Sequence, residues 1–162
     1  MTQGEKMKIT CPDFKHGESI PSLYTCEGNN TNPPLEFSEI PPRTKSLVLI
    51  LDDPDVPEEV RPEKMYDHWI VFNIPPSTKK IEANKKPIGM QGKNTSGEIK
   101  YTGPCPPHQY APKEHRYYFK LYALDQMLPL KEGATKHEVE IAMKKHILAE
   151  ATLIGRYKKH KL

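Results

Sequence analysis

The chain has 162 residues, the size of one ordinary domain, and its formal net charge is +3. Its 17 prolines against 9 glycines exclude a helical bundle, because proline cannot donate to helix or sheet hydrogen bonds. The composition therefore favours a β-rich protein with many loops. The lysines are scattered, apart from the tail at residues 158–161, so we expect no nucleic-acid interface.

The sequence predicts a cytoplasmic protein. No segment is apolar over the length needed to span a membrane, and residues 1–10 lack the apolar core of a signal peptide. The cysteines Cys11, Cys26 and Cys105 form no CxxC pair, so neither a zinc knuckle nor a redox dithiol is expected. An odd number of cysteines in such a chain favours free thiols, although one pair could bond.

The first two predicted strands are apolar along their length. Residues 46–53 (SLVLILDD) are typical of a strand covered on both faces. Residues 68–74 (HWIVFNI) predict a second strand, which a proline pair ends. Regular alternation places His68 on the same face as Ile70 and Phe72.

Residues 115–124 (HRYYFKLYAL) show the clearest period of two in the chain. This pattern predicts a strand with one face toward a core. The predicted inward set is His115, Tyr117, Phe119, Leu121 and Ala123.

A helix is predicted near the C-terminus. Thr135 followed by Glu138 fits a capping box. Apolar and aromatic positions then recur at helical spacing, at Val139, Ala142, Met143 and His146. Residues 151–157 predict a last strand. The architecture is therefore one domain over residues 1–162, mainly β, with one helix packed on a sheet or sandwich.

Three carboxylates directly follow the first predicted strand. Pro54 favours an extended conformation at Asp53, so Asp53 and Asp55 should point one way and Asp52 the other. Carboxylates beside a buried strand are costly unless they are paired or used, which favours a pocket here. A turn built from Asp and Pro is the alternative interpretation.

Two histidines and a tyrosine lie at the beginning of the second and third predicted strands. A lone histidine at the position of His68 is more often a satisfied core residue than a functional one. His115 and Tyr117 are neighbours on one strand face and can both hydrogen-bond an anionic oxygen, although aromatic packing explains them equally. Gly103, in a rigid Gly-Pro segment, allows a ligand to approach the backbone closely.

Taken together, these motifs resemble the phosphatidylethanolamine-binding protein (PEBP) family, and more closely its bacterial and archaeal Raf-kinase-inhibitor-like branch. The motifs are DDPDVP, DHWIVFNIP, the glycine-containing segment 92–107 that ends in GPCPP, and HRYYFKLYALD. The resemblance extends from His16 to the final AEATLIGRY. It implies a β-sandwich in which a large antiparallel sheet packs on a smaller one, with an α-helix on the C-terminal side.

The family's pocket is a small anion site that accepts phosphate, acetate and phospho-headgroups. The resemblance implies ligand-binding roles for Asp53, Asp55, His68, Trp69, Gly103, Pro104, His115 and Tyr117. It implies no catalytic residue, no cofactor and no metal. The loop from His108 to Glu114 departs from the family pattern because it contains no glycine, so we expect a pocket mouth of different shape.

These residues predict a protein that binds a small anion or lipid headgroup rather than an enzyme. Asp53 either favours the imidazolium form of a histidine that holds the anion, or receives the ammonium group of a zwitterionic ligand. The alternative function is a metal-assisted or acid/base hydrolase that uses Asp53, His68 and His115. The family name also implies a protein partner, a kinase or a protease that is inhibited, and a homodimer is a further option.

Overall fold

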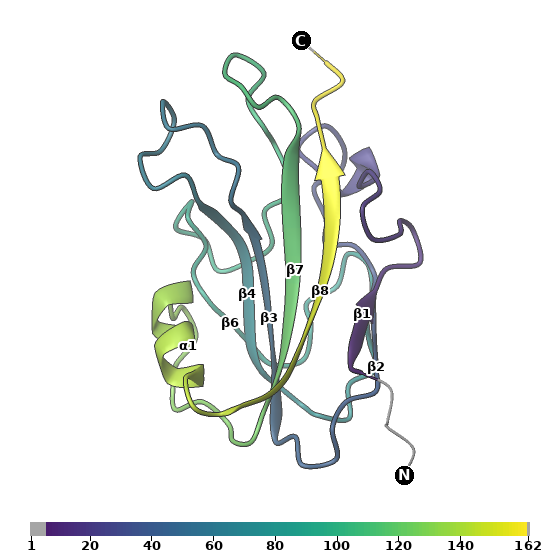
Figure 1. Cartoon of the computed structure of the whole chain (residues 1–162), viewed down its shortest axis with the longest axis vertical. Helices are drawn as coiled ribbons and strands as arrows, with labels where there is room; N and C mark the ends of the chain where they lie inside the picture. Colours follow the sequence, from purple (N-terminus) through teal and green to yellow (C-terminus); the bar gives the residue numbers. More distant parts are fainter. Residues whose placement is uncertain (1–5, 162) are drawn as a thin grey trace.

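The computed structural model describes residues 6–161 as two antiparallel β-sheets packed against each other, with one α-helix beside the larger sheet (Figure 1). The five-stranded sheet has the order β6-β4-β3-β7-β8, and the three-stranded sheet has the order β1-β2-β5. The strands are β1 (Lys8–Thr10), β2 (Leu35–Ser38), β3 (Ser46–Asp53), β4 (Tyr66–Ile74), β5 (Lys80–Ile81), β6 (Met90–Gln91), β7 (His115–Leu124) and β8 (Ile147–Tyr157). The helices are the short 3₁₀ turn η1 (Ser22–Tyr24) and α1 (Lys136–Met143).

The predicted β-sandwich with a helix near the C-terminus is confirmed. The predicted domain 1–162 and the N-terminal segment 1–10 include residues 1–5 and 162, which lie outside the described residues. No helix within residues 6–161 has the length and apolar character needed to cross a membrane.

β3 is the central strand of the larger sheet and is buried at every position. Leu49 and Leu51 belong to the core between the two sheets, whereas Val48 and Ile50 belong to a second cluster that includes Val139 of α1. The prediction of a strand covered on both faces is therefore confirmed. Burial of both faces explains why its sequence does not alternate.

The start of β4 departs from regular alternation. Leu51 of β3 pairs with Trp69, and the next residue, Asp52, pairs with Asp67. His68 is therefore an extra residue of β4 that has no pairing partner on β3. Such a β-bulge turns neighbouring side chains toward the same side of the sheet and re-aims one of them.

The bulge overturns one expectation. Regular alternation placed His68 on the face of Ile70 and Phe72, but these two residues lie in the cluster beneath α1. His68 lies on the opposite side, with its ring centroid 5.3 Å from that of Tyr117. The prediction was wrong because the apolar pattern of the strand does not show the inserted residue.

The C-terminal third follows the predictions closely. β7 has the predicted bounds, and its alternate residues Tyr117 and Phe119 are fully buried. The capping box of Thr135 and Glu138 is present, but α1 ends at Met143 and so excludes the predicted position at residue 146. The last strand begins at Ile147, four residues earlier than predicted.

Candidate functional site

A cavity of about 210 Å³ lies at the end of the larger sheet where β3 ends and β4 and β7 begin. These strand ends meet because the strands run antiparallel and are adjacent. The segment that precedes β7 supplies most of the remaining wall. The lining residues are Asp53, Val56, Val60, Tyr66, His68, Thr102, Gly103, Cys105, Pro106, Pro107, His115 and Tyr117.

The structure brings together five of the eight residues named from the sequence, which are Asp53, His68, Gly103, His115 and Tyr117. It leaves Asp55, Trp69 and Pro104 outside the lining. Each of these three has contacts of its own.

Asp55 is at the rim and is bound to Arg116. Its carboxylate accepts from the Arg116 backbone amide at 2.9 Å and from the guanidinium Nε and terminal nitrogen at 2.9 and 2.8 Å. The hydrogen bonds from Arg116 hold the pKa of Asp55 below its usual value. Asp55 therefore stays ionised and fixes the loop after β3 to the start of β7.

Trp69 points away from the cavity into the inter-sheet core. Its indole Nε1 donates to Gln91 Oε1 at 2.9 Å, and its ring meets Tyr101 edge to face. Pro104 acts through its carbonyl, which accepts from the Cys26 amide at 3.1 Å. Both residues support the wall of the cavity from behind.

Asp53 and His115 form a buried pair. His115 Nδ1 lies 2.6 Å from Asp53 Oδ2, and the two side chains are 1% and 4% exposed. The other carboxylate oxygen, Oδ1, accepts from the Asp55 amide at 2.7 Å. Both oxygens of Asp53 are therefore occupied by neighbouring protein groups.

The second ring nitrogen of His115 is also occupied. Nε2 lies 3.1 Å from the carbonyl oxygen of Pro112. A carbonyl oxygen can only accept, so Nε2 is the donor in this contact. The glycine-free loop 108–114 thus covers His115 at the mouth of the cavity.

His68 has one nitrogen in use. Its Nδ1 donates to the Thr102 carbonyl oxygen at 2.7 Å, so the ring nitrogen left for a ligand is Nε2. Burial lowers the pKa of His68 below its usual value, while the Thr102 hydrogen bond partly opposes this. His68 is therefore neutral at pH 7, and its Nε2 is a hydrogen-bond acceptor.

Tyr117 supplies the complementary donor. Its hydroxyl is buried beside the cavity and makes no hydrogen bond of normal geometry within residues 6–161, although the Asp53 carboxylate lies close to it. Burial, followed by the nearby charge of Asp53, raises the pKa of this phenol far above its usual value. The hydroxyl thus keeps its hydrogen at every physiological pH.

Asp52 points to the opposite face, as predicted. Its buried carboxylate oxygen Oδ2 lies 3.0 Å from Lys120 Nζ and 3.2 Å from Lys136 Nζ. Lys136 also lies 2.8 Å from Asp67, so this network ties the start of α1 to β3 and β4. The adjacent carboxylates therefore separate into one that anchors the helix and one that faces the cavity.

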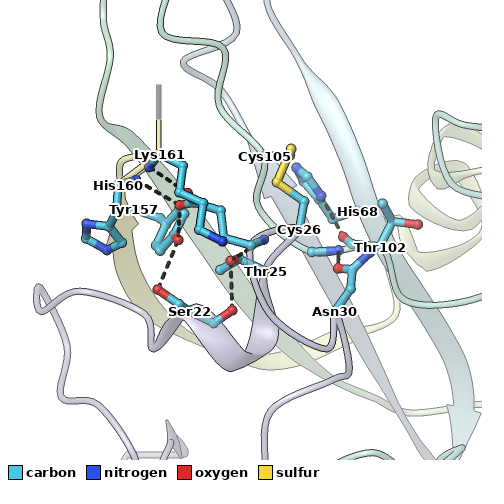
Figure 2. Close-up of a disulfide and its surroundings, with 12 residues drawn as sticks. Ser22, Thr25, Cys26, Asn30, His68, Thr102, Cys105, Tyr157, His160 and Lys161 are labelled. Carbon is cyan, nitrogen blue, oxygen red and sulfur yellow. Dashed lines mark hydrogen bonds between the residues drawn. A yellow bond between two sulfur atoms is a disulfide. The ribbon is translucent and has the colours of Figure 1, made fainter.

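The cysteines differ from the prediction of free thiols. Cys26 and Cys105 form a disulfide across 79 residues, while Cys11 is free and buried. Figure 2 shows the disulfide close to the hydrogen bond between His68 and Thr102. The prediction was wrong for this pair because only the fold brings the two distant segments together.

Sequence reasoning missed several lining residues, among them Tyr66, Val56 and Val60. Tyr66 lies two positions before His68, so the period of two on a strand could have indicated it. The two valines lie in the loop after Asp53, where no periodic signal exists. Together with Pro106 and Pro107, they make the outer part of the cavity apolar.

The polar groups of the cavity divide into two sets. Asp53 and His115 bind each other, and the second ring nitrogen of His115 lies against the Pro112 carbonyl oxygen. The groups available to a ligand include an acceptor, His68 Nε2, and a donor, the Tyr117 hydroxyl.

Comparison with known proteins identifies the family. The model of the phosphatidylethanolamine-binding protein family matches residues 10–158. A UPF0098 protein of Chlamydia muridarum is 47% identical over 151 residues, which cover 93% of this chain and 98% of that protein.

Two solved structures agree with this match. A PEBP homologue from Chlamydia trachomatis is 45% identical with a TM-score of 0.90, and the match covers 95% of this chain and 98% of that one. The E. coli protein YbcL, described as a member of the mammalian PEBP family, is 29% identical with a TM-score of 0.84, and the match covers 96% and 99%.

The fold and the cavity define a β-sandwich protein with a small pocket at one end of its larger sheet. The chain belongs to the phosphatidylethanolamine-binding protein family, among the prokaryotic homologues of the UPF0098 and YbcL type.

Proposed function

We propose that this protein binds small phosphate-bearing anions, either inorganic phosphate or a phospho-headgroup, in the strand-end cavity. The observation that carries the proposal is the buried Tyr117 hydroxyl at the cavity, which makes no hydrogen bond of normal geometry to the described residues. A buried donor left unpaired costs on the order of 1–3 kcal/mol, and a ligand oxygen that accepts from it removes this cost.

His68 adds a requirement for a proton. A phosphate that carries one P–OH group can donate it to His68 Nε2 while another oxygen accepts from Tyr117. A fully ionised oxyanion has no such hydrogen, so it needs His68 in the imidazolium form. A fully ionised oxyanion should therefore take up a proton on the His68 ring when it binds, whereas inorganic phosphate already carries the hydrogen that it donates.

The sequence left two roles open for Asp53, either holding a histidine that binds the anion or receiving the ammonium group of a zwitterionic ligand. Both oxygens of Asp53 already accept hydrogen bonds, from the Asp55 amide and from His115. This favours a role for Asp53 in holding His115 over a role as receptor of a ligand ammonium group.

The dependence of affinity on pH tests the proton requirement. Calorimetric titration with sulfate should give tighter binding at pH 5 than at pH 8. Because the folded pKa of His68 lies below 6.5, sulfate binding should appear only below that pH and strengthen as the pH falls. Inorganic phosphate keeps a P–OH group at both pH values and should bind at both. Equal sulfate affinity at pH 5 and pH 8 would show that His68 does not supply the hydrogen.

Removal of the donor tests the proposal directly. Tyr117→Phe deletes a hydroxyl that makes no hydrogen bond of normal geometry to the described residues, so the fold should be retained while phosphate affinity falls about tenfold or more. Tyr118→Phe, on the opposite face of the same strand, is the matched control and should bind as the parent does. Unchanged affinity in Tyr117→Phe would refute the proposal, and unchanged affinity in His68→Ala would remove His68 from the site.

A further inference from the structure

The Cys26–Cys105 disulfide joins the cavity wall to a separate turn of the chain. Cys105 lines the cavity, whereas Cys26 lies outside the lining, in the turn that follows η1. In Figure 2 the disulfide lies between the C-terminal Tyr157–Lys161 segment and the pair of His68 and Thr102. Oxidation or reduction of this disulfide therefore directly affects a residue of the cavity wall.

The turn that carries the first cysteine is held in place without the disulfide. Backbone hydrogen bonds close it on itself within residues 22–30. Glu27 in addition accepts from the Tyr157 hydroxyl and from the backbone amides of His160 and Lys161, at 2.9 and 2.8 Å for the two amides. This side should keep its position when the disulfide opens.

The wall that carries the second cysteine is held much more weakly. In the described structure no backbone amide of residues 105–114 donates to another backbone group, and three of these ten residues are prolines. This segment is otherwise held by the contact of Pro112 with His115 and by an exposed ion pair between Glu114 and Arg156, and next to it the Pro104 carbonyl accepts from the Cys26 amide. Apart from the backbone at its two ends, the disulfide is the covalent cross-link that joins this segment to the described part of the protein.

The disulfide is also accessible. Cys26 and Cys105 are both exposed residues, whereas the free Cys11 is buried. Thiol–disulfide exchange requires access of the attacking thiolate to a sulfur atom, and exposed disulfides are the ones that exchange readily.

We infer that the Cys26–Cys105 disulfide is a redox-controlled latch on the anion pocket. A dithiol reductant attacks one sulfur, a mixed disulfide forms, and the second thiol of the reductant resolves it. Two electrons and two protons thereby convert the cystine into two thiols, and the reductant becomes a disulfide. Residues 105–114 then lose their covalent tie to the turn, and the wall of the cavity loosens.

Loosening of the wall weakens binding because a ligand must then order it again. Reduced protein should bind phosphate about five- to tenfold more weakly than oxidised protein. This inference rests on the proposed anion-binding function, but the opening of the wall does not. The two can therefore be tested apart.

The affinity test compares phosphate titrations of oxidised protein with those of protein reduced by dithiothreitol. Cys26→Ser leaves the cavity lining unchanged and should bind weakly under both conditions. Cys11→Ala keeps the disulfide and should respond to reduction as the parent does. Equal affinities of the oxidised, reduced and Cys26→Ser proteins would overturn the control of binding by the latch.

The second test needs no ligand. Tryptic cleavage after the exposed Lys113 should be several-fold faster in the reduced parent and in Cys26→Ser than in the oxidised parent. Unchanged cleavage would overturn the latch even if phosphate binds. If the oxidised parent binds no phosphate, the proposed function fails, and faster cleavage on reduction would still support a latch on this wall.

Discussion

Two His–Asp pairs of the same chemistry allow a direct test of what burial contributes to this fold. His115 and Asp53 lie 2.6 Å apart and are 1% and 4% exposed, whereas His146 and Asp125 lie 2.9 Å apart and are 33% and 46% exposed. Asp53→Ala leaves both His115 Nδ1 and the Asp55 amide without their acceptor. Asp125→Ala leaves groups that water can reach.

The expected losses in the free energy of unfolding differ severalfold between the two variants. Removing one partner of a buried pair costs on the order of 3–5 kcal/mol, and removing an exposed pair costs at most about 1 kcal/mol. For a chain of this size the first loss lowers the melting temperature by roughly 6–20 °C and the second by about 4 °C or less.

Asp53→Asn should fall between these limits. Its amide can donate to Nδ1 of a neutral His115 while its oxygen still accepts from the Asp55 amide, so only the charge-assisted part of the bond is lost, about 1–2 kcal/mol. The assay is equilibrium unfolding in urea at pH 7 with the disulfide intact. Equal losses in Asp53→Ala and Asp125→Ala would refute the reasoning that burial determines the strength of these pairs.

Two further predictions concern the wall and the helix. Gly103→Ala should both destabilise the protein and weaken phosphate binding, because a Cβ at this position would lie 2.2 Å from the Tyr24 carbonyl oxygen. An unchanged stability in urea or an unchanged affinity by calorimetry would contradict this. Thr135→Ala removes the acceptor for the Glu138 amide at the start of α1 and should cost about 1 kcal/mol in urea unfolding without changing phosphate affinity, so a change in affinity would show that the helix cap influences the cavity.

The amino-acid sequence by itself determined the main strands, the helix cap and most of the polar residues of the cavity. β3 and β7 have the predicted bounds, and the Thr135 capping box is present, because burial and capping leave local patterns in the chain. The motif order was also sufficient to predict the family, which the comparisons confirm.

The tertiary structure alone decided which of these residues face one another. The bulge at His68 depends on register with β3, and the Cys26–Cys105 disulfide joins segments 79 residues apart, so neither leaves a periodic signal. The Pro112 carbonyl at His115 Nε2 likewise depends on the path of a loop. Contacts between distant segments follow from the packing of the whole chain. For this reason the choice of His115 over His68 as the partner of Asp53, and the position of the Tyr117 hydroxyl at the cavity, became visible only in three dimensions.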